Sequence, residues 1–402
     1  MAPAESGIRP VPRRLLAVNA GSSSIRFALF EAGAGLRKIR DGKLERIGLP
    51  GTNLAARAPD GTTTRRDLDA ADHRSAAAAL IDWLTAESLI AGLGAIGHRV
   101  VHGMRRVEPA LVTPALLAEL RAITPYDPEH LPREIALIED FAARIAAPQV
   151  ACFDTAFHAT LPTCAARLPI PRRYGDAGVR RYGFHGLSYA YLCEELRRLG
   201  EPAAARGRLI LAHLGNGASM AAVRDGRSID TTMGFTPAGG LVMSTRSGDL
   251  DPGLACYFAR AEGRDAASFQ TMVNHESGLL GISETSSDVR DLLAREADDP
   301  RAAEALEVFC YQARKWIGAL AAALGGVDAL VFAGGIGENA APIRARICAE
   351  LGFLGITLDE ARNVRNEPMI SPAGAATAVR VVPTDEERMI ARHTLAVLTA
   401  AP

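Results

Sequence analysis

Apolar residues follow two spacings along the chain, one typical of helices and the other typical of short buried strands. Between Leu306 and Leu324, for example, they fall on one helical stripe, and Gly325 closes the segment. Because the two kinds of segment alternate throughout, the pattern predicts the α/β class. Helices are expected at 75–90, 131–145 and 301–326, and strands at 15–18, 25–30, 95–103, 149–157 and 327–335.

The opening pair of strands is repeated weakly in the second half of the chain. Residues 209–228 share the plan of residues 15–30, an apolar strand, a turn of Gly, Asn and Ser, and a second strand, with Gly21 matching Gly215. Chance similarity of two hairpins is the alternative. If the repeat is real, two related domains each present a small-residue turn to a cleft between them, where ligands commonly bind.

The turn of the first hairpin has two interpretations. A plain β-turn explains small residues between two strands. A phosphate-binding turn explains them equally, because glycine admits a close backbone approach while N–H and hydroxyl groups point at oxygens. The residues concerned are Asn19, Gly21, Ser22, Ser23 and Ser24.

Composition narrows the class of protein. The chain has 402 residues, 48% of them hydrophobic and 23% charged, with a net charge of −1. These values predict an enzyme of two or three domains that binds neither nucleic acid nor an anionic membrane through charge. The six cysteines form no CxxC pair, and the first 14 residues read as a loose tail without a signal-peptide core. We therefore expect a cytoplasmic protein with no membrane span.

Two nucleotide-binding motifs are set aside. The segment "GLGAIG" at 92–97 matches GxGxxG, but it follows a helix and precedes a strand, the reverse of the dinucleotide-binding order. We predict a connecting loop there. No GxxxxGK[ST] occurs, so the sequence has no P-loop.

Three polar residues are candidates for chemistry, two of them at predicted strand ends and the third before a predicted helix. Arg99 in "GHRVVHG" suits a carboxylate or phosphate, or else a structural ion pair. Asp154 in "FDTAFH" would orient a reacting group or an arginine, although a helix cap is the simpler interpretation of this stretch alone. His185 in "YGFHGLSY" would stabilise developing charge, or else pack as a hydrogen-bonded core histidine.

Glycine-rich loops supply further candidates. "HLGNG" at 213–217 follows a strand and would bring backbone close to phosphate, or form a tight hairpin. The stretch 233–253 is a long loop around Arg246, for which an ion pair with Asp249 is the simpler explanation. The segment 332–347 reads as strand, glycine-rich bend and helix, and would seat an adenine or a phosphate.

The stretch "VVPTDEERMIARHTL" near the end of the chain reads as a strand, a capping residue and a helix. Thr384 or Asp385 is expected to cap this helix. Glu386 and Glu387 fall in its first turn, where the helix dipole alone would explain them.

The order and wording of these stretches resemble the acetate and propionate kinase family, of the sugar kinase, Hsp70 and actin superfamily. The resemblance runs from about Leu15 to Leu395. It is carried by "VNAGSSSIR", "HRVVHG", "FDTAFH", "YGFHGLSY", "HLGNGAS", "MGFTP", "TRSGDLDP", "GISETSSDVR", "GGIGEN" and "PTDEE". It implies a duplicated two-domain, ribonuclease H-like α/β fold with a central cleft. The implied domains are 1–155 with 388–402, and 156–387, and closure of the cleft over substrate is a hypothesis.

The implied activity is reversible, direct in-line transfer of a phosphoryl group from ATP to acetate, giving acetyl phosphate and ADP. The resemblance also implies Mg²⁺, with Mn²⁺ as an alternative, and a homodimer. The residues implied for catalysis are Arg99, Asp154, His185 and Arg246; for the metal, Asn19 and Glu386; and for the acid, Arg99, Val101, Phe184 and Pro237. Those implied for the nucleotide are Arg26, His213, Leu214, Gly215, Asn216, Gly217, Asp288, Val289, Arg290, Gly335, Ile336, Gly337, Glu338 and Asn339.

Several positions depart from the family pattern and leave the acid and the nucleotide preference open. They are Arg26 for Lys, Met104 for Gly, "TPYDP" with Tyr126 for "APLHNP", Gly239 for Glu, and Val289 for Phe. A propionate- or butyrate-type kinase is therefore one alternative. An Hsp70- or actin-like nucleotide switch is the alternative of a different class. Such a switch would need a substrate-binding appendage or a polymer surface, and we expect no spare domain in this chain.

Overall fold

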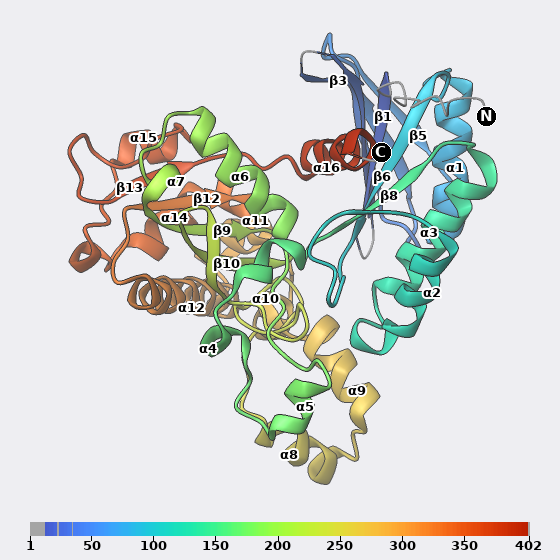
Figure 1. The fold of residues 1–402 in the computed structure, drawn as a ribbon. Helices are drawn as coiled ribbons and strands as arrows, with labels where there is room; N and C mark the ends of the chain where they lie inside the picture. Colours follow the sequence, from blue (N-terminus) through green and yellow to red (C-terminus); the bar gives the residue numbers. More distant parts are fainter. Residues whose placement is uncertain (1–12, 22–23, 34, 401–402) are drawn as a thin grey trace. The chain divides into compact units, whose positions relative to one another are not determined.

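The computed structural model describes residues 13–21, 24–33 and 35–400. They form two compact units (Figure 1). Unit 1 comprises the described residues up to Ala156 and those from Asp385 onward, and unit 2 runs from Phe157 to Thr384. Asp385, Glu386 and Glu387 thus lie in unit 1. The resemblance implied a boundary at residue 388, which places these three residues in the second domain. The last helix begins at Glu386.

The sheet of unit 1 has the strand order β5-β4-β3-β2-β1-β6-β8-β7. β1 pairs antiparallel with β2 and parallel with β6, which in turn pairs parallel with β8. The strands are β1 (Arg14–Ala20), β2 (Ser24–Ala32), β3 (Leu36–Glu45), β4 (Asn53–Arg57), β5 (Thr63–Asp67), β6 (Leu93–Val100), β7 (Ala110–Leu111) and β8 (Gln149–Phe153).

Helices cover this sheet, and the last one packs on it closely. Gly97 in β6 makes that contact, since a Cβ there would overlap Thr394 Oγ1 and lie 2.6 Å from Ile390 Cγ2. The helices are α1 (His73–Ala86), α2 (Pro114–Ala122), α3 (Leu131–Arg144) and α16 (Glu386–Ala400), with a 3₁₀ turn η1 (Thr124–Tyr126) and another, η2 (Ala156–Thr160), at the boundary of the two units.

The sheet of unit 2 has the order β11-β10-β9-β12-β13. β9 pairs antiparallel with β10 and parallel with β12, and β12 pairs parallel with β13. This repeats the order β3-β2-β1-β6-β8 of unit 1, and it confirms the predicted duplication. The strands are β9 (Arg208–Leu214), β10 (Ala218–Arg224), β11 (Arg227–Thr231), β12 (Ala329–Ala333) and β13 (Ala378–Val381).

The main helix of unit 2 is α12 (Pro300–Leu324), as predicted. The Asp299 side chain caps it, Gly325 ends it with φ of 70°, and the apolar stripe from Leu306 to Leu324 is buried. The others are α4 (Thr163–Ala166), α5 (Arg172–Asp176), α6 (Gly186–Arg198), α7 (Ala203–Arg206), α8 (Gly253–Glu262), α9 (Ala266–Thr271), the π-helical turn η3 (Met272–Glu276), α10 (Gly278–Ser283), α11 (Val289–Arg295), α13 (Gly334–Asn339), α14 (Ala341–Cys348), η4 (Gly352–Leu354) and α15 (Glu360–Val364).

Two predictions of local structure were wrong. "GLGAIG" at 92–97 is not a connecting loop, because Leu93 already begins β6. The glycine-rich bend after β12 is the short helix α13. The predicted loop at 233–253 is confirmed, since no helix or strand lies between Thr231 and Gly253. The predicted tail up to residue 12, and Ser22 and Ser23, lie outside the described residues.

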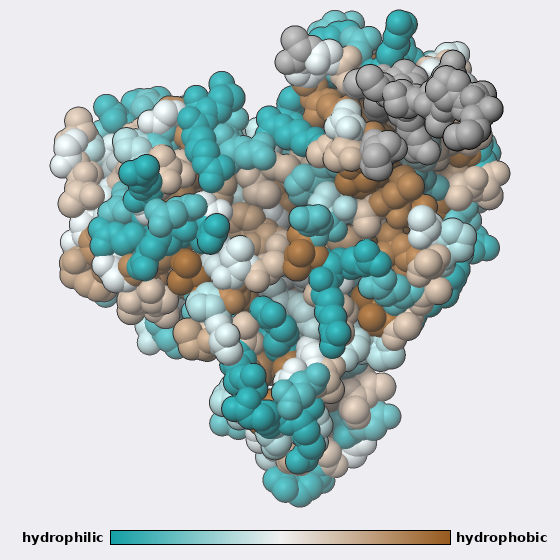
Figure 2. All heavy atoms as spheres, in the orientation of Figure 1, coloured by the Kyte–Doolittle hydropathy of each residue, from teal (hydrophilic) through white to brown (hydrophobic). Residues whose placement is uncertain are grey.

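Hydrophilic residues cover most of the face shown in Figure 2, and the hydrophobic ones lie singly or in small groups. Within the described ranges, no helix has the length and apolar character needed to cross a membrane.

Candidate active site

Arg99 and Asp154 meet where two parallel strands of unit 1 end. Arg99 lies near the end of β6, and Asp154 directly follows β8, so the parallel register brings their side chains together. Arg99 donates to Asp154 Oδ2 from Nε at 2.9 Å and from Nη2 at 2.5 Å. Asp154 is fully buried. Asp154 is therefore the carboxylate that holds Arg99.

The charge of Arg99 is secure in this setting. Burial alone lowers the pKa of a guanidinium, but the carboxylates of Asp154 and Glu386 raise the pKa of Arg99 above its ordinary value. Its Nη1 lies 3.4 Å from Asn19 Oδ1 and from the Ala20 carbonyl, both long contacts. Arg99 is thus a permanent cation, fixed along its Nε–Nη2 edge, at the end of the sheet.

Asn19 and the start of α16 form the next part of the constellation. Asn19 Nδ2 donates to Glu386 Oε2 at 2.7 Å and to Glu387 Oε1 at 3.1 Å. Asn19 is the next-to-last residue of β1, and Asp385 accepts from Arg388 N, which caps the helix that carries both glutamates. The structure therefore brings Asn19, Glu386, Arg99 and Asp154 together within unit 1.

Glu387 is a site residue that the sequence reasoning missed. The helix dipole explains an acidic residue at this position, but it does not explain why the side chain reaches Asn19. Burial, and then the charge of Glu386, raise the pKa of Glu387. Two adjacent acidic residues in a first turn, directly after a strand, were the signal that could have identified it.

These oxygen groups fit Mg²⁺. Over the part of the chain that the structure describes, no group of three or more His, Cys, Asp or Glu side chains converges to hold a metal. Mg²⁺ does not require such a group, because it keeps several waters and binds through one or two carboxylates together with substrate phosphates. The two glutamates repel each other beside Asn19, and a divalent cation would relieve that repulsion.

His185 is the centre of the candidate groups in unit 2. It precedes α6 with φ of 58° and ψ of 24°, an uncommon conformation outside glycine. Its Nδ1 is 2.9 Å from Ser219 Oγ, and its ring stacks on His213 with 4.3 Å between centroids. A Cβ on Gly217 would lie 3.2 Å from His185 Nε2 and 3.6 Å from Arg246 Nη1. Gly217 therefore leaves room between these two side chains.

The loop around Arg246 is held by its own hydrogen bonds. Arg246 Nη1 donates to the Pro237 carbonyl at 3.2 Å, while Asp249 Oδ1 accepts from Gly240 N at 2.8 Å. Asp249 thus supports the backbone of this loop. Arg246 instead borders Gly217 together with His185.

The two glycine-rich segments of unit 2 lie side by side after parallel strands. Ala333 of β12 pairs with His213 of β9, and a Cβ on Gly334 would lie 2.7 Å from the Leu214 carbonyl. Glu338 Oε1 accepts from Gly334 N at 2.9 Å and from Thr384 N at 3.1 Å. Glu338 therefore supports the turn at Gly334.

The remaining predicted residues are more scattered. Asp288 caps α11 by accepting from Arg290 N. The Arg290 side chain, which is 88% exposed, also pairs with Asp288.

The predicted acid contacts divide between the units: Val101 is buried in unit 1, while Phe184 and Pro237 belong to unit 2. Arg26 is exposed on β2, opposite Asn19. Asn216, Gly335, Ile336, Gly337 and Asn339 lie in the two glycine-rich segments, and Val289 is buried at the start of α11.

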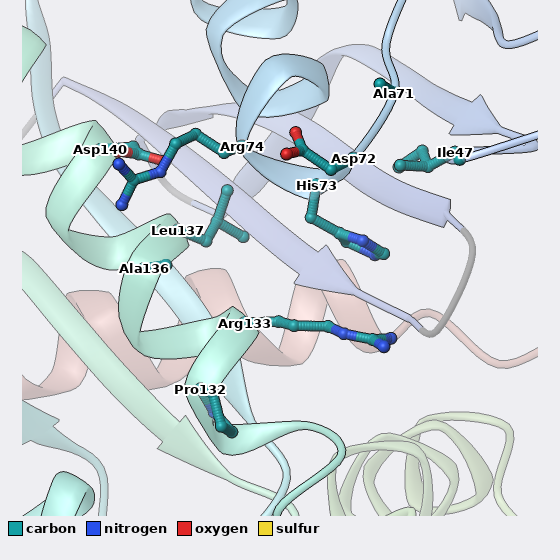
Figure 3. Close-up of a pocket in the computed structure, with 11 residues that line it drawn as sticks. Ile47, Ala71, Asp72, His73, Arg74, Pro132, Arg133, Ala136, Leu137 and Asp140 are labelled. Carbon is teal, nitrogen blue, oxygen red and sulfur yellow. The ribbon is translucent and has the colours of Figure 1, made fainter.

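A cavity of about 440 Å³ lies elsewhere in unit 1, between the N-terminal parts of α1 and α3 (Figure 3). His73 lines it, and His73 Nε2 also lies 2.9 Å from the Gly21 carbonyl in the first turn. Neither Arg99 nor Asp154 lines this cavity, so it is distinct from the constellation described above.

Comparison with known proteins gives a consistent result. The Acetokinase family profile matches residues 14–392. Acetate kinase of Rhodopseudomonas palustris (strain ATCC BAA-98 / CGA009) is 45% identical over 94% of this chain and 97% of that protein. Propionate kinase of Citrobacter rodentium is 42% identical over 96% and 97%.

Solved structures agree. The crystal structure of Porphyromonas gingivalis acetate kinase has a TM-score of 0.85 and 37% identity over 96% of this chain and 99% of that chain. For a propionate kinase from Francisella tularensis the values are 0.87 and 36%, over 95% and 98%.

Proposed function

The chain belongs to the acetokinase family, and from this premise we propose that it transfers the terminal phosphoryl group of ATP reversibly to acetate, with propionate as the close alternative. The observation that carries the proposal is the constellation of Arg99, Asp154, Asn19 and Glu386 at one end of the unit 1 sheet. A carboxylic acid is already ionised at neutral pH, so the reaction needs alignment and charge stabilisation and no strong base.

Arg99 supplies the positive charge in unit 1. Asp154 occupies its Nε–Nη2 edge, and the Nη1 end makes only long contacts with protein oxygens. That end is the part of the guanidinium that we assign to the acid or to the transferred phosphoryl group. Because Asp154 fixes the plane of the guanidinium, this charge is placed before substrate binds.

His185 and Arg246 supply the charges in unit 2. If Ser219 donates to His185 Nδ1, then Nε2 carries the proton and donates toward the space beside Gly217. Arg246 borders the same space. We assign both side chains to the oxygens of the transferred phosphoryl group, where charge develops as the bond to ADP breaks.

Mg²⁺ is part of the proposal, with Mn²⁺ as an alternative. When bound, it would neutralise nucleotide phosphate charge. Asn19 and Glu386, with Glu387 adjacent, are the residues that would hold it through oxygen atoms and through its waters.

The test is trapping of the acyl phosphate by hydroxylamine in reactions with MgATP and a series of acids from formate to butyrate. We expect hydroxamate formation with kcat/KM highest for acetate. A higher kcat/KM for propionate than for acetate would identify a propionate kinase. The structural reason for that alternative is Tyr126, which replaces a residue of the family pattern. Its ring lies beside buried His102, with 6.2 Å between the ring centroids. No hydroxamate with any acid would contradict the proposal and favour a nucleotide switch.

We further propose a homodimer that works in the cytoplasm. The family resemblance supports the dimer, and sedimentation velocity would test it. All six cysteines are free thiols, and four of them are buried, which fits a reducing compartment.

A further inference from the structure

Glu134 is a buried carboxyl group with no role in the reaction described so far. It lies in the first turn of α3 and is 3% exposed. The helix dipole favours an acidic residue there, but it does not explain one that is turned inward, since glutamates are almost never fully buried without a partner.

The partner of Glu134 is the backbone at the end of β6. The N–H of Val101, the first residue beyond the strand, donates to Glu134 Oε2 at 3.0 Å, with Oε1 at 3.2 Å. Val101 itself is 2% exposed. The chain leaves the sheet at this point, so this bond fixes its direction directly after Arg99 and Val100.

Charged groups surround Glu134 from three other segments. They are Arg99 on β6, Asp127 in the turn before α3, and Asp154 after β8. Burial is the largest influence and raises the pKa of Glu134 to about 8, although Arg99 and the Val101 N–H oppose the rise. At neutral pH the group is therefore mostly protonated, and glutamine is its closest analogue.

We propose that Glu134 is a positioning residue, which fixes the Val101 amide and thereby holds Arg99 and Val101 in place for the acid. This inference rests on the proposed function, because that function puts both residues against the acid. Glu134 acts through the backbone and does not itself touch the reacting atoms.

Two variants and a control test the kinetic effect. Glu134→Gln keeps an acceptor for Val101 N, whereas Glu134→Leu removes it. Glu139→Leu makes the same change on the exposed side of α3, where Glu139 pairs with Arg121. We expect the KM for the acid to rise on the order of tenfold in Glu134→Leu, the size of one lost buried hydrogen bond. It should stay within about threefold of wild type in Glu134→Gln and in the control, and the KM for ATP should stay unchanged in all.

Hydrogen exchange separates the positioning role from the activity. The Val101 amide should be protected in the wild type and in Glu134→Gln, and should exchange at least about tenfold faster in Glu134→Leu. If the wild type lacked acid kinase activity, the proposed function would fail while this measurement still tested the link. An unchanged acid KM together with unchanged Val101 protection in Glu134→Leu would overturn the inference.

A pH profile decides the matter even if Glu134→Leu does not fold. In the wild type, deprotonation above pH 8 places a second negative charge near Asp154, so the KM for the acid should rise from about pH 8 upward. In Glu134→Gln it should stay flat over the same range. Identical profiles for the two proteins would overturn the inference.

Discussion

Removing Arg99 tests whether its charge is catalytic or merely structural. The side chain of Arg99 is 14% exposed and that of Asp154 is fully buried, so Arg99→Met leaves a carboxylate without its counter-charge. Breaking a buried pair in this way costs about 3–5 kcal/mol of the free energy of unfolding. Replacing both partners by apolar residues, as in Arg99→Met/Asp154→Leu, avoids the unpaired charge and should recover most of that loss.

Activity should not follow stability in this pair of variants. The double variant still lacks the cation, so kcat should fall by about 10³-fold in both, the scale of an arginine at a transferred phosphoryl group. Guanidinium unfolding curves give the free energy of unfolding, and the hydroxamate assay gives kcat. Comparing the double variant with Arg99→Met and with Asp154→Leu yields the coupling energy of Arg99 with Asp154.

A surface ion pair on α2 and α3 provides the control. Arg121 and Glu139 have side chains that are 51% and 41% exposed. Arg121→Met should change the free energy of unfolding by less than about 1 kcal/mol and leave kcat unchanged. If the double variant Arg99→Met/Asp154→Leu regained near wild-type kcat along with its stability, the catalytic role of Arg99 would be refuted.

Three further outcomes are expected. The contribution of Glu134 to the free energy of unfolding should fall by several kcal/mol between about pH 5 and pH 8, because the folded carboxyl holds its proton up to about pH 8 and the unfolded one releases it near 4.5; the difference between guanidinium titrations of the wild type and of Glu134→Gln should change with pH by this amount. Glu387→Gln should raise the Mg²⁺ concentration for half-maximal activity about tenfold in a metal titration, and an unchanged value would remove it from the site. Gly97→Ala should lower the free energy of unfolding by about 1–3 kcal/mol, since the added Cβ meets Thr394 and Ile390, and thermal unfolding would show it.

The sequence predicted the helices and strands that can be recognised from the spacing of hydrophobic residues within one segment. The buried stripe of α12 and the parallel strand β12 are read directly from residue types. By contrast, the strands between Leu36 and Asp67 went unpredicted, because β5 is exposed along its whole length and β3 alternates charged residues without a clear apolar face. The loop prediction at 92–97 failed because Gly97 packs against a helix nearly three hundred residues later in the chain, and no local pattern reveals that contact.

The candidate site shows the same division. The motifs singled out Arg99 and Asp154, but their pairing depends on the register between β6 and β8, which the sequence does not fix. Glu134 and Glu387 were missed because the burial of Glu134 and the contact of Glu387 with Asn19 both arise from tertiary packing. In isolation, both are ordinary acidic residues in the first turn of a helix.

The bond between Asn19 and Glu386 has a consequence for biosynthesis. On the ribosome, β1 and β6 are synthesised before all of unit 2, whereas α16 is synthesised after it. Until then the sheet surface around Gly97 lacks its covering helix. A nascent chain therefore lacks Glu386 and Glu387 until all of unit 2 has been synthesised, and premature termination upstream of Glu386 yields a protein without a complete unit 1.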